Sequence, residues 1–211
     1  MTPGEAPRVR GATRADVPLL AAVLSRAFLS ESQFVWLQPD EELRARLLPA
    51  MFRMEVQHVH PIDRGGQVLL QDGGLVAGAV WAAPGQWKAS MWRQLPGIPR
   101  LIFSLGRENL QGFAKRGKAL QDALAKAHPS EPHWYLAALG VDPAAQRKGV
   151  GATLMRAGLG RCDREGTPAY LECLERLVPY YQRFGFETRG PIAMPDGAPG
   201  QIGMWRPAKQ R

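Results

Sequence analysis

The segment from Trp134 to Phe186 constrains the fold of this chain most strongly. It runs an apolar stretch, WYLAALGV, into a polar loop, DPAAQRK, and then into a helix start that contains glycine, GVGATLM. Gly149 and Gly151 carry no side chain where the loop becomes a helix, so another group can approach the backbone closely there. This order of strand, loop and helix predicts a layered α/β arrangement.

The start of this predicted helix has the chemistry of an anion site. The first N–H groups of a helix lack acceptors within the helix, and the helix dipole adds about half a positive charge there. Arg147 and Lys148 add two side-chain charges at the same place. Phosphate is therefore the expected ligand, although a GxG pattern by itself also occurs in ordinary tight turns.

Length and composition favour one globular domain. The chain has 211 residues, 45% of them hydrophobic and 22% charged, which is typical of a single compact domain. We therefore assign residues 1–211 to one domain. The first residues contain no apolar stretch like that of a signal peptide, and no stretch is long and apolar enough to span a membrane. Cys162 and Cys173 are too few for a disulfide framework and lie in no metal-site spacing. We expect a cytoplasmic protein with no metal and no membrane partner.

The formal charge of +8 raises the question of a nucleic-acid partner. The arginines are scattered along the chain, without a long basic run or a DNA- or RNA-binding signature. A solvated basic surface is therefore the preferred interpretation, and a nucleic-acid partner is not expected. The same charge would attract a polyanionic small molecule.

Hydrophobic periodicity predicts strands and helices in alternation. A strand at 8–12 precedes a helix that starts at Val17 and carries one apolar stripe. A second helix follows Asp40, and two strands lie at 67–71 and 75–83. The later predicted elements are a strand at 133–141, a helix at 149–164, a strand at 168–173, a helix at 177–184, and strands at 186–190 and 201–206. Between them, residues 86–130 have a weaker, partly helical pattern that suits either a structural connection or a lid over a substrate.

Gln146, Gly149 and Gly151, directly after an apolar strand, resemble the first signature of the GNAT family of N-acetyltransferases. The run PYYQRFGF at 179–186 resembles the family's second signature, a helix that carries a tyrosine and ends at a Gly-Phe pair. Over residues 131–206, and in WAAPG at 81–85, the chain is similar to the puromycin N-acetyltransferase branch. The resemblance implies the GNAT fold, a mixed and mostly antiparallel sheet flanked by helices, with a central parallel strand pair around the coenzyme site.

The resemblance also implies acetyl-CoA as co-substrate. In the family, the strand edge pairs with the pantetheine arm and the loop with the helix start binds the pyrophosphate. Carried over to this sequence, the coenzyme-binding residues are Leu139, Gly140, Val141, Gln146, Arg147, Lys148, Gly149, Val150, Gly151 and Ala152. At position 177 the chain has leucine where close relatives have asparagine, so one hydrogen bond toward the coenzyme, worth about 1 kcal/mol, is missing.

Tyr181 matches the tyrosine that gives a proton to the departing thiolate in the family. A phenol is protonated at neutral pH and suits that task. The alternative is a core aromatic, since Leu177, Tyr181 and Phe184 share one helical face. Tyr180 is expected to point elsewhere.

Glu172, at the carboxyl end of the strand at 168–173, is the candidate base for the amine. The alternative is an ion pair between Glu172 and Arg176. Glu31 is a weaker candidate for the base. Three histidines, His58, His60 and His133, rank lower still.

The acceptor is the least determined part of the prediction. Phe34, Trp36 and Trp81 lie in segments that border the acceptor cleft in the family, which would suit a flat or aromatic amine. They suit core packing equally well. We expect transfer of an acetyl group to the primary amine of a small molecule, by direct attack in a ternary complex. The alternatives are a protein acetyltransferase and a non-catalytic module that binds coenzyme A or nucleic acid. A homodimer is left open.

Overall fold

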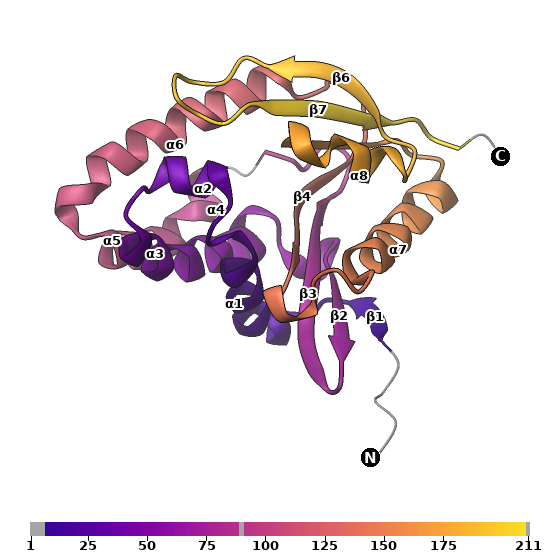
Figure 1. Ribbon diagram of the computed structural model, residues 1–211, viewed down its shortest axis with the longest axis horizontal. Helices are drawn as coiled ribbons and strands as arrows, with labels where there is room; N and C mark the ends of the chain where they lie inside the picture. The colour runs from indigo at the N-terminus through magenta and orange to yellow at the C-terminus, as the bar shows by residue number, and fades with distance from the viewer. Residues whose placement is uncertain (1–6, 89–90, 210–211) are drawn as a thin grey trace.

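A computed structural model describes residues 7–88 and 91–209, with one seven-stranded sheet at its centre (Figure 1). The first six residues, and residues 89–90 of the segment considered as a lid, lie outside the described part. The strand order is β1-β2-β3-β4-β5-β7-β6, and every neighbouring pair is antiparallel except β4 and β5. The strands are β1 (Arg8–Gly11), β2 (Gln67–Gln71), β3 (Gly74–Ala82), β4 (Trp134–Val141), β5 (Ala169–Leu174), β6 (Glu187–Ile192) and β7 (Gln201–Arg206). The predicted mixed, mostly antiparallel sheet with a parallel pair is confirmed.

Helices cover both faces of this sheet. They are α1 (Val17–Phe28), α2 (Ser32–Leu37), α3 (Glu41–Met54), α4 (Met91–Gln94), α5 (Ile98–Leu105), α6 (Arg107–Ala127), α7 (Val150–Glu165) and α8 (Val178–Gln182). Figure 1 shows α1 and α3 on one side of β2 to β4 and α7 on the other. Side chains of β3 alternate between the two cores: Val80 packs with α1, and Trp81 packs with α7. This alternation is the period of a strand that is buried on both faces.

The entry to α1 is fixed by a capping box. The side chain of Asp16 accepts hydrogen bonds from the N–H and hydroxyl of Thr13 at 2.8 and 2.9 Å. Arg10 donates two further bonds of 2.7 Å to the same carboxylate. The two groups therefore connect β1 to the first helix.

The parallel pair is short, and this opens the sheet. Only Trp134 with Ala169 and Tyr135 with Tyr170 are paired between β4 and β5. Beyond these residues, β4 stays paired with β3 and β5 stays paired with β7, but β4 and β5 are no longer paired with each other. In Figure 1, β6 and β7 consequently run at a steep angle to β2, β3 and β4. The edge of β4 after Tyr135 thus faces the gap between the two halves of the sheet.

A β-bulge lies next to this gap. Val80 pairs with Ala138 and Trp81 pairs with Leu136, so Ala137 is an extra residue in β4. As a result, Leu136 and Leu139 pack against the same core although they are three residues apart. A bulge of this kind redirects the rest of its strand. Here that is the part of β4 for which coenzyme contacts are predicted.

The described part of 86–130, where the sequence pattern was weak, contains α4, α5 and the long helix α6. Helix α6 lies alongside β6 and above α2 in Figure 1. Arg116 of α6 donates a 2.9 Å hydrogen bond to the carbonyl of Leu37, which joins α6 to the end of α2. Helix α2 was not predicted from the sequence. It begins at Ser32 because the Glu31 carboxylate accepts the Gln33 N–H at 3.0 Å and caps it.

Candidate active site

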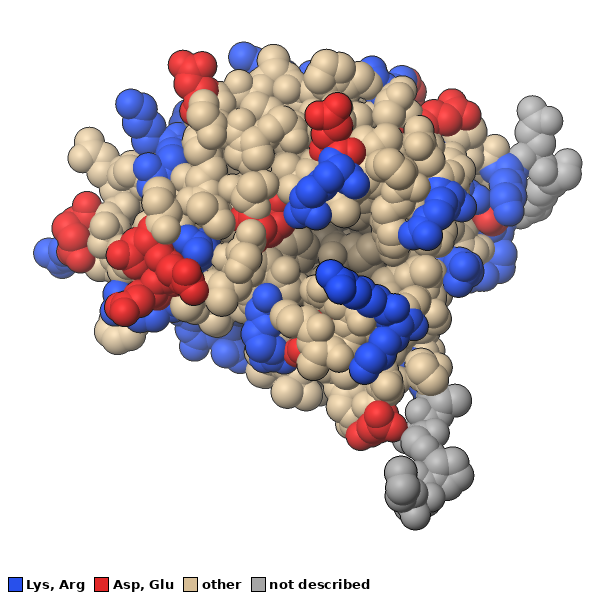
Figure 2. All heavy atoms as spheres, in the orientation of Figure 1, with Lys and Arg blue, Asp and Glu red and all other residues tan. Residues whose placement is uncertain are grey.

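A cavity of about 860 Å³ opens where β4 ends and α7 begins; we call it the basic cavity. Its lining comes from α1, the end of β4, the loop before α7, and α8, and includes Arg26, Phe28, Glu31, Leu139, Val141, Arg147, Gly149, Val150, Gly151, Arg176, Leu177, Tyr180, Tyr181 and Arg183. Figure 2 shows a hollow in the middle of this face with Lys and Arg side chains around it. The cavity is therefore suited to a negatively charged ligand.

The loop before α7 bends sharply so that its backbone faces the cavity. Arg147 and Gly149 have positive φ angles of 63° and 78°, a conformation that glycine adopts without strain. The first backbone hydrogen bond of the helix runs from Thr153 N–H to Gly149 O at 3.0 Å. The N–H groups of Val150 to Ala152 therefore have no acceptor along the helix.

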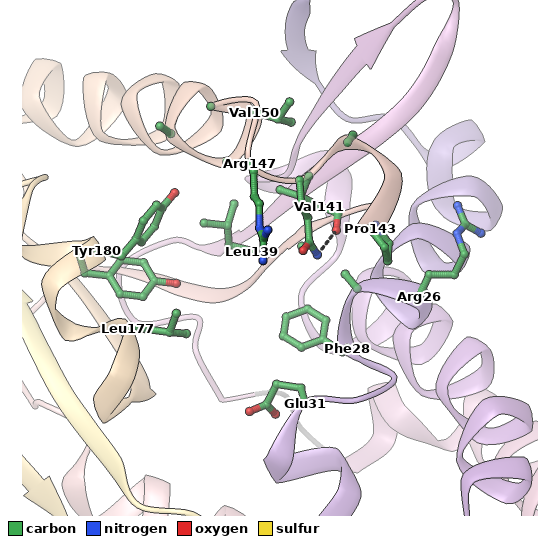
Figure 3. A pocket seen from close by; sticks show the side chains of 18 of the residues that line it. Arg26, Phe28, Glu31, Leu139, Val141, Pro143, Arg147, Val150, Leu177 and Tyr180 are labelled. Atoms are coloured by element: carbon green, nitrogen blue, oxygen red, sulfur yellow. Dashed lines mark hydrogen bonds between the residues drawn. The ribbon is translucent and has the colours of Figure 1, made fainter.

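Side chains hold this loop in place. The amide of Gln146 donates a 3.1 Å hydrogen bond to the carbonyl of Val141, drawn as a dashed line in Figure 3. Asp142 accepts a 2.8 Å bond from Arg26 of α1 and a 3.1 Å bond from the Ala144 N–H. Because no side chain projects from Gly149 and a Cβ there would meet no atom within 4 Å, the backbone is open to a ligand.

All but one of the ten predicted coenzyme-binding residues line the basic cavity. Leu139 and Val141 approach it from β4, and Arg147 approaches it from the loop (Figure 3). Lys148 is the exception, since it is exposed and donates a 3.2 Å hydrogen bond to the carbonyl of Ala144.

Tyr181 lines the basic cavity and is 8% exposed. Burial, with smaller effects of Cys173 and Tyr180, raises the pKa of Tyr181 above its usual value of about 10, so it keeps its proton at neutral pH. The core role weighed as the alternative also holds, because Tyr181 packs into the core beside α7.

Tyr180 differs from its prediction. It was expected to point elsewhere, but it lines the same cavity as Tyr181. Its hydroxyl lies beside the start of α7, where a Cβ at Gly151 would be 3.1 Å from it. Two consecutive tyrosines of the short helix α8 thus face one cavity, although consecutive residues of a helix point about 100° apart.

A second cavity of about 560 Å³ lies under α6; we call it the aromatic cavity. Its walls come from α2, α3, α6, β4, β5 and the segment after β3. They include Phe34, Met51, Phe52, Met54, Glu55, His60, Trp87, Lys88, Asp122, Leu124, His128, Tyr135, Ala137, Ala138 and Glu172. Aromatic rings and three carboxylates thus surround the same space, which suits a cation with an apolar body.

The two cavities adjoin at β4. Ala138 lines the aromatic cavity and the next residue, Leu139, lines the basic cavity. On the α1 side, Phe28 of the basic cavity and Phe34 of the aromatic cavity are in edge contact, with ring centroids 5.4 Å apart. A group that reaches through the gap beside β4 would pass from one cavity to the other.

Glu172 faces the aromatic cavity with a side chain that is only 7% exposed. Its Oε1 lies 3.5 Å from Nδ1 of His128 and makes no hydrogen bond to another described residue. The ion pair considered with Arg176 is not the arrangement found, because Arg176 lines the basic cavity. Burial and the nearby Glu172 carboxylate raise the pKa of Tyr135 well above 10.

A histidine–carboxylate pair lies on the opposite wall. Nδ1 of His60 is 2.5 Å from Oε1 of Glu55, and its Nε2 is 2.9 Å from the carbonyl of Trp87. Burial opposes protonation of this ring, but the bond with Glu55 prevails and raises the pKa of His60 above 6.5.

Two predicted acceptor contacts do not fit. Trp81 is 2% exposed and packs against α7, where a Cβ at Gly158 would lie 2.7 Å from the indole. Trp36 lies near Gly197. Neither tryptophan lines the basic or the aromatic cavity, so we withdraw both as acceptor contacts. Phe34 keeps its predicted place at the aromatic cavity.

Several residues of the aromatic cavity were not predicted from the sequence, namely Glu55, Trp87, His128 and Tyr135. His128 and Trp87 lie at the two ends of the weakly patterned segment, and their rings stack with centroids 3.6 Å apart. No local pattern connects residues so distant in the chain. Tyr135 alternates with core residues along a strand, and that position alone could have marked it.

In the described residues, no group of three or more His, Cys, Asp or Glu side chains is arranged to hold a metal ion. None of the helices within 7–88 and 91–209 combines the length and apolar character needed to cross a membrane.

Comparison with known proteins places the chain in a family. The model of the acetyltransferase (GNAT) family matches residues 59–186. An uncharacterised N-acetyltransferase of Schizosaccharomyces pombe is 30% identical over 178 residues, which cover 81% of this chain and 70% of that protein.

Solved structures agree. A Corynebacterium glutamicum structure, titled as histone acetyltransferase HPA2 and related acetyltransferase, has a TM-score of 0.73 and 27% identity, with 98% of this chain and 99% of that chain covered. The PaiA N-acetyltransferase of Thermoplasma acidophilum in complex with coenzyme A shares the fold, with a TM-score of 0.56 and 12% identity over 96% of this chain and 99% of that chain. The chain belongs to the acetyltransferase (GNAT) family.

Proposed function

We propose that this protein transfers an acetyl group from acetyl-CoA to the primary amine of a small molecule, by direct attack in a ternary complex. The observation that carries the proposal is the pair of adjoining cavities at the gap between β4 and β5. The basic cavity presents free backbone donors and Tyr181, and the aromatic cavity presents Glu172.

The basic cavity fits coenzyme A by its chemistry. The N–H groups at the start of α7, the bare backbone of Gly149 and the guanidinium of Arg147 suit a diphosphate. The edge of β4 beyond Tyr135 is not paired with β5, so it can pair with an extended chain such as the pantetheine arm. Leu177, which stands where close relatives have asparagine, removes only one hydrogen bond toward the coenzyme.

The side chains around the gap provide for each proton of the transfer. Glu172 takes a proton from the ammonium group, which gives an amine with a free lone pair. That lone pair forms the C–N bond at the thioester carbonyl, and backbone N–H groups near Val141 stabilise the oxyanion. The C–S bond then breaks with its electron pair on sulfur, to which Tyr181 gives a proton, and the second proton lost by the nitrogen restores the Tyr181 phenol.

The shape of the acceptor site favours a small molecule. Helix α6 and the stacked rings of Trp87 and His128 cover the aromatic cavity, which supports the lid role for residues 86–130. Puromycin-like amines are the first class to test because of the branch resemblance. A protein acceptor is the second candidate, since the Corynebacterium relative is titled as a histone acetyltransferase and related acetyltransferase. The cytoplasm remains our proposed location.

The experiment is a thiol-release screen with acetyl-CoA over aromatic amines, aliphatic amines, histone-tail peptides and buffer alone, with products identified by mass spectrometry. We expect release that depends on an aromatic or apolar amine and matches N-acetylated product one for one. Release with peptides only would favour the protein acceptor. Coenzyme binding without release for any amine would overturn the proposal in favour of a binding module. Binding to duplex DNA at two salt concentrations checks the nucleic-acid alternative.

A further inference from the structure

The ring of His128 is buried among aromatic rings and has a polar neighbour at each nitrogen. It stacks on Trp87 with centroids 3.6 Å apart and meets Tyr135 and Tyr170 edge-on at 4.9 and 5.0 Å. Its side chain is 1% exposed. Both ring nitrogens face polar atoms: Nδ1 faces Glu172 at 3.5 Å and Nε2 faces His133 at 3.0 Å.

The neighbours of His128 decide which of its nitrogens carries hydrogen. Nδ1 of His133 lies 2.6 Å from the carbonyl of Glu131, which only accepts, so this nitrogen carries the proton. Burial lowers the pKa of His133, with smaller opposing effects, so the ring stays neutral and its Nε2 is an acceptor. The 3.0 Å contact then requires an N–H on Nε2 of His128. In neutral His128, Nδ1 is left with a lone pair directed at Glu172.

Glu172 needs such a neighbour because of the proton balance. An ammonium group that becomes an amide loses two protons, and the leaving sulfur gains one. The other proton has to stay with the protein until the products leave. The Glu172 carboxylate is only 7% exposed, so it has little solvent to which it could pass that proton.

We propose that His128 is the proton store of the base: Glu172 takes the first proton of the ammonium group, and Nδ1 of His128 then holds it. The O–H bond at Glu172 breaks as the N–H bond at His128 forms. Glu172 returns to a carboxylate beside an imidazolium, which is a favourable pair in a buried site. The 3.5 Å separation is within the range from which catalytic contacts tighten on substrate binding.

Besides Glu172, none of the titratable and charged groups described around His128 replaces this role. They are Tyr170 on β5, Tyr135 on β4, His133 before β4, Asp122 on α6, Lys88 beside Trp87, and Glu55 with His60 across the cavity. Glu55 already binds His60 at 2.5 Å, so it is engaged with another histidine. His133 acts through His128 and is a positioning residue.

The kinetic test compares His128→Asn with His58→Asn, a histidine that lines neither cavity. For amines that arrive as ammonium ions, His128→Asn should lower kcat/KM about 10- to 1,000-fold at neutral pH. This loss in kcat/KM should disappear above the pKa of the amine. It should also disappear for an amine of low pKa, which arrives uncharged. His58→Asn should match wild type. An equal loss for all amines at every pH, or no loss, would overturn the proposal.

A second test does not depend on acetyl transfer, and so separates this inference from the proposed function on which it rests. In protein labelled with 15N-histidine, NMR should show His133 with hydrogen on Nδ1 and neutral His128 with hydrogen on Nε2. Neutral His128 with hydrogen on Nδ1 would refute the store even if amines are acetylated. If His128→Asn fails to fold, His128→Gln, whose amide can still reach His133, takes its place.

Discussion

Tyr181 and Glu172 line two different cavities, whose linings adjoin at Leu139 and Ala138 of β4. Tyr181 lies on α8 and Glu172 lies on β5. The short pairing of β4 with β5 creates the opening between them. The proposed chemistry therefore follows from the place where the sheet divides.

Replacing Tyr181 by Phe should lower kcat about 10- to 10,000-fold, because it removes the proton donor for the leaving thiolate. Affinity for coenzyme A, measured by calorimetry, should change little. Tyr180→Phe is the matched control on the same helix and in the same cavity, and it should keep most of the activity. A larger loss in Tyr180→Phe would transfer the acid role to Tyr180.

The pH profile supplies a further check on Tyr181. Because its pKa is raised above 10, the phenol stays protonated throughout the neutral and mildly alkaline range. We expect kcat to show no decline between pH 8 and about pH 10 that depends on the phenol. A decline centred below pH 9 in wild type that disappears in Tyr181→Phe would contradict this.

At Gly149, a negative charge should oppose the diphosphate. Gly149→Asp should weaken coenzyme A binding about 10- to 100-fold relative to Gly149→Asn, which has the same shape without the charge. Both variants bear the strain of a φ angle of 78°, so the comparison isolates electrostatics. The difference should decrease as salt rises. Equal affinities of the two variants would place the phosphates elsewhere.

Gly158 tests the reassignment of Trp81 to the core. A methyl group at Gly158 would overlap the buried indole at 2.7 Å, so Gly158→Ala should lower the free energy of unfolding by about 1–2 kcal/mol despite better helix propensity. Gly160→Ala in the same helix meets its first atom at 3.6 Å and should be neutral or stabilising. Urea unfolding measures both. A Gly158→Ala protein with the same free energy of unfolding as wild type would mean that the indole can move away.

Asp16 makes stability depend on pH. The Arg10 guanidinium, with further bonds from Thr13, holds the pKa of Asp16 well below its usual range. Since the folded-state pKa is depressed, this stabilisation is complete above about pH 4 and is lost as pH falls further. Asp16→Asn should cost about 1–2 kcal/mol at pH 7 and much less at pH 2. An equal cost at both pH values would show that the charge contributes nothing.

Local signals in the sequence located the bend before α7 well. Glycines with special backbone angles, an apolar strand before them and a helix after them are short-range features, and Gly149 and Gly151 lie where predicted. The strand at 201–206 has the predicted bounds for the same reason. The family resemblance supplied Tyr181 and Glu172.

Features that depend on tertiary contacts were not predictable. The extra residue Ala137 in β4 is defined only by the register with β3. Trp81 and Phe34 look alike as aromatic candidates, but one faces α7 and the other faces a cavity. The proposed role of His128 depends on its contact with Glu172, and the fold of the weakly patterned segment brings the two residues together.

Direct transfer between the two cavities is tested most directly in a single turnover. Protein loaded with acetyl-CoA is mixed with the best amine from the screen, and thiol release and intact protein mass are followed with and without that amine. We expect an unmodified protein throughout and rapid thiol release only after the amine is added. An acetylated protein that forms before the amine is added, or equal thiol release without it, would contradict direct attack.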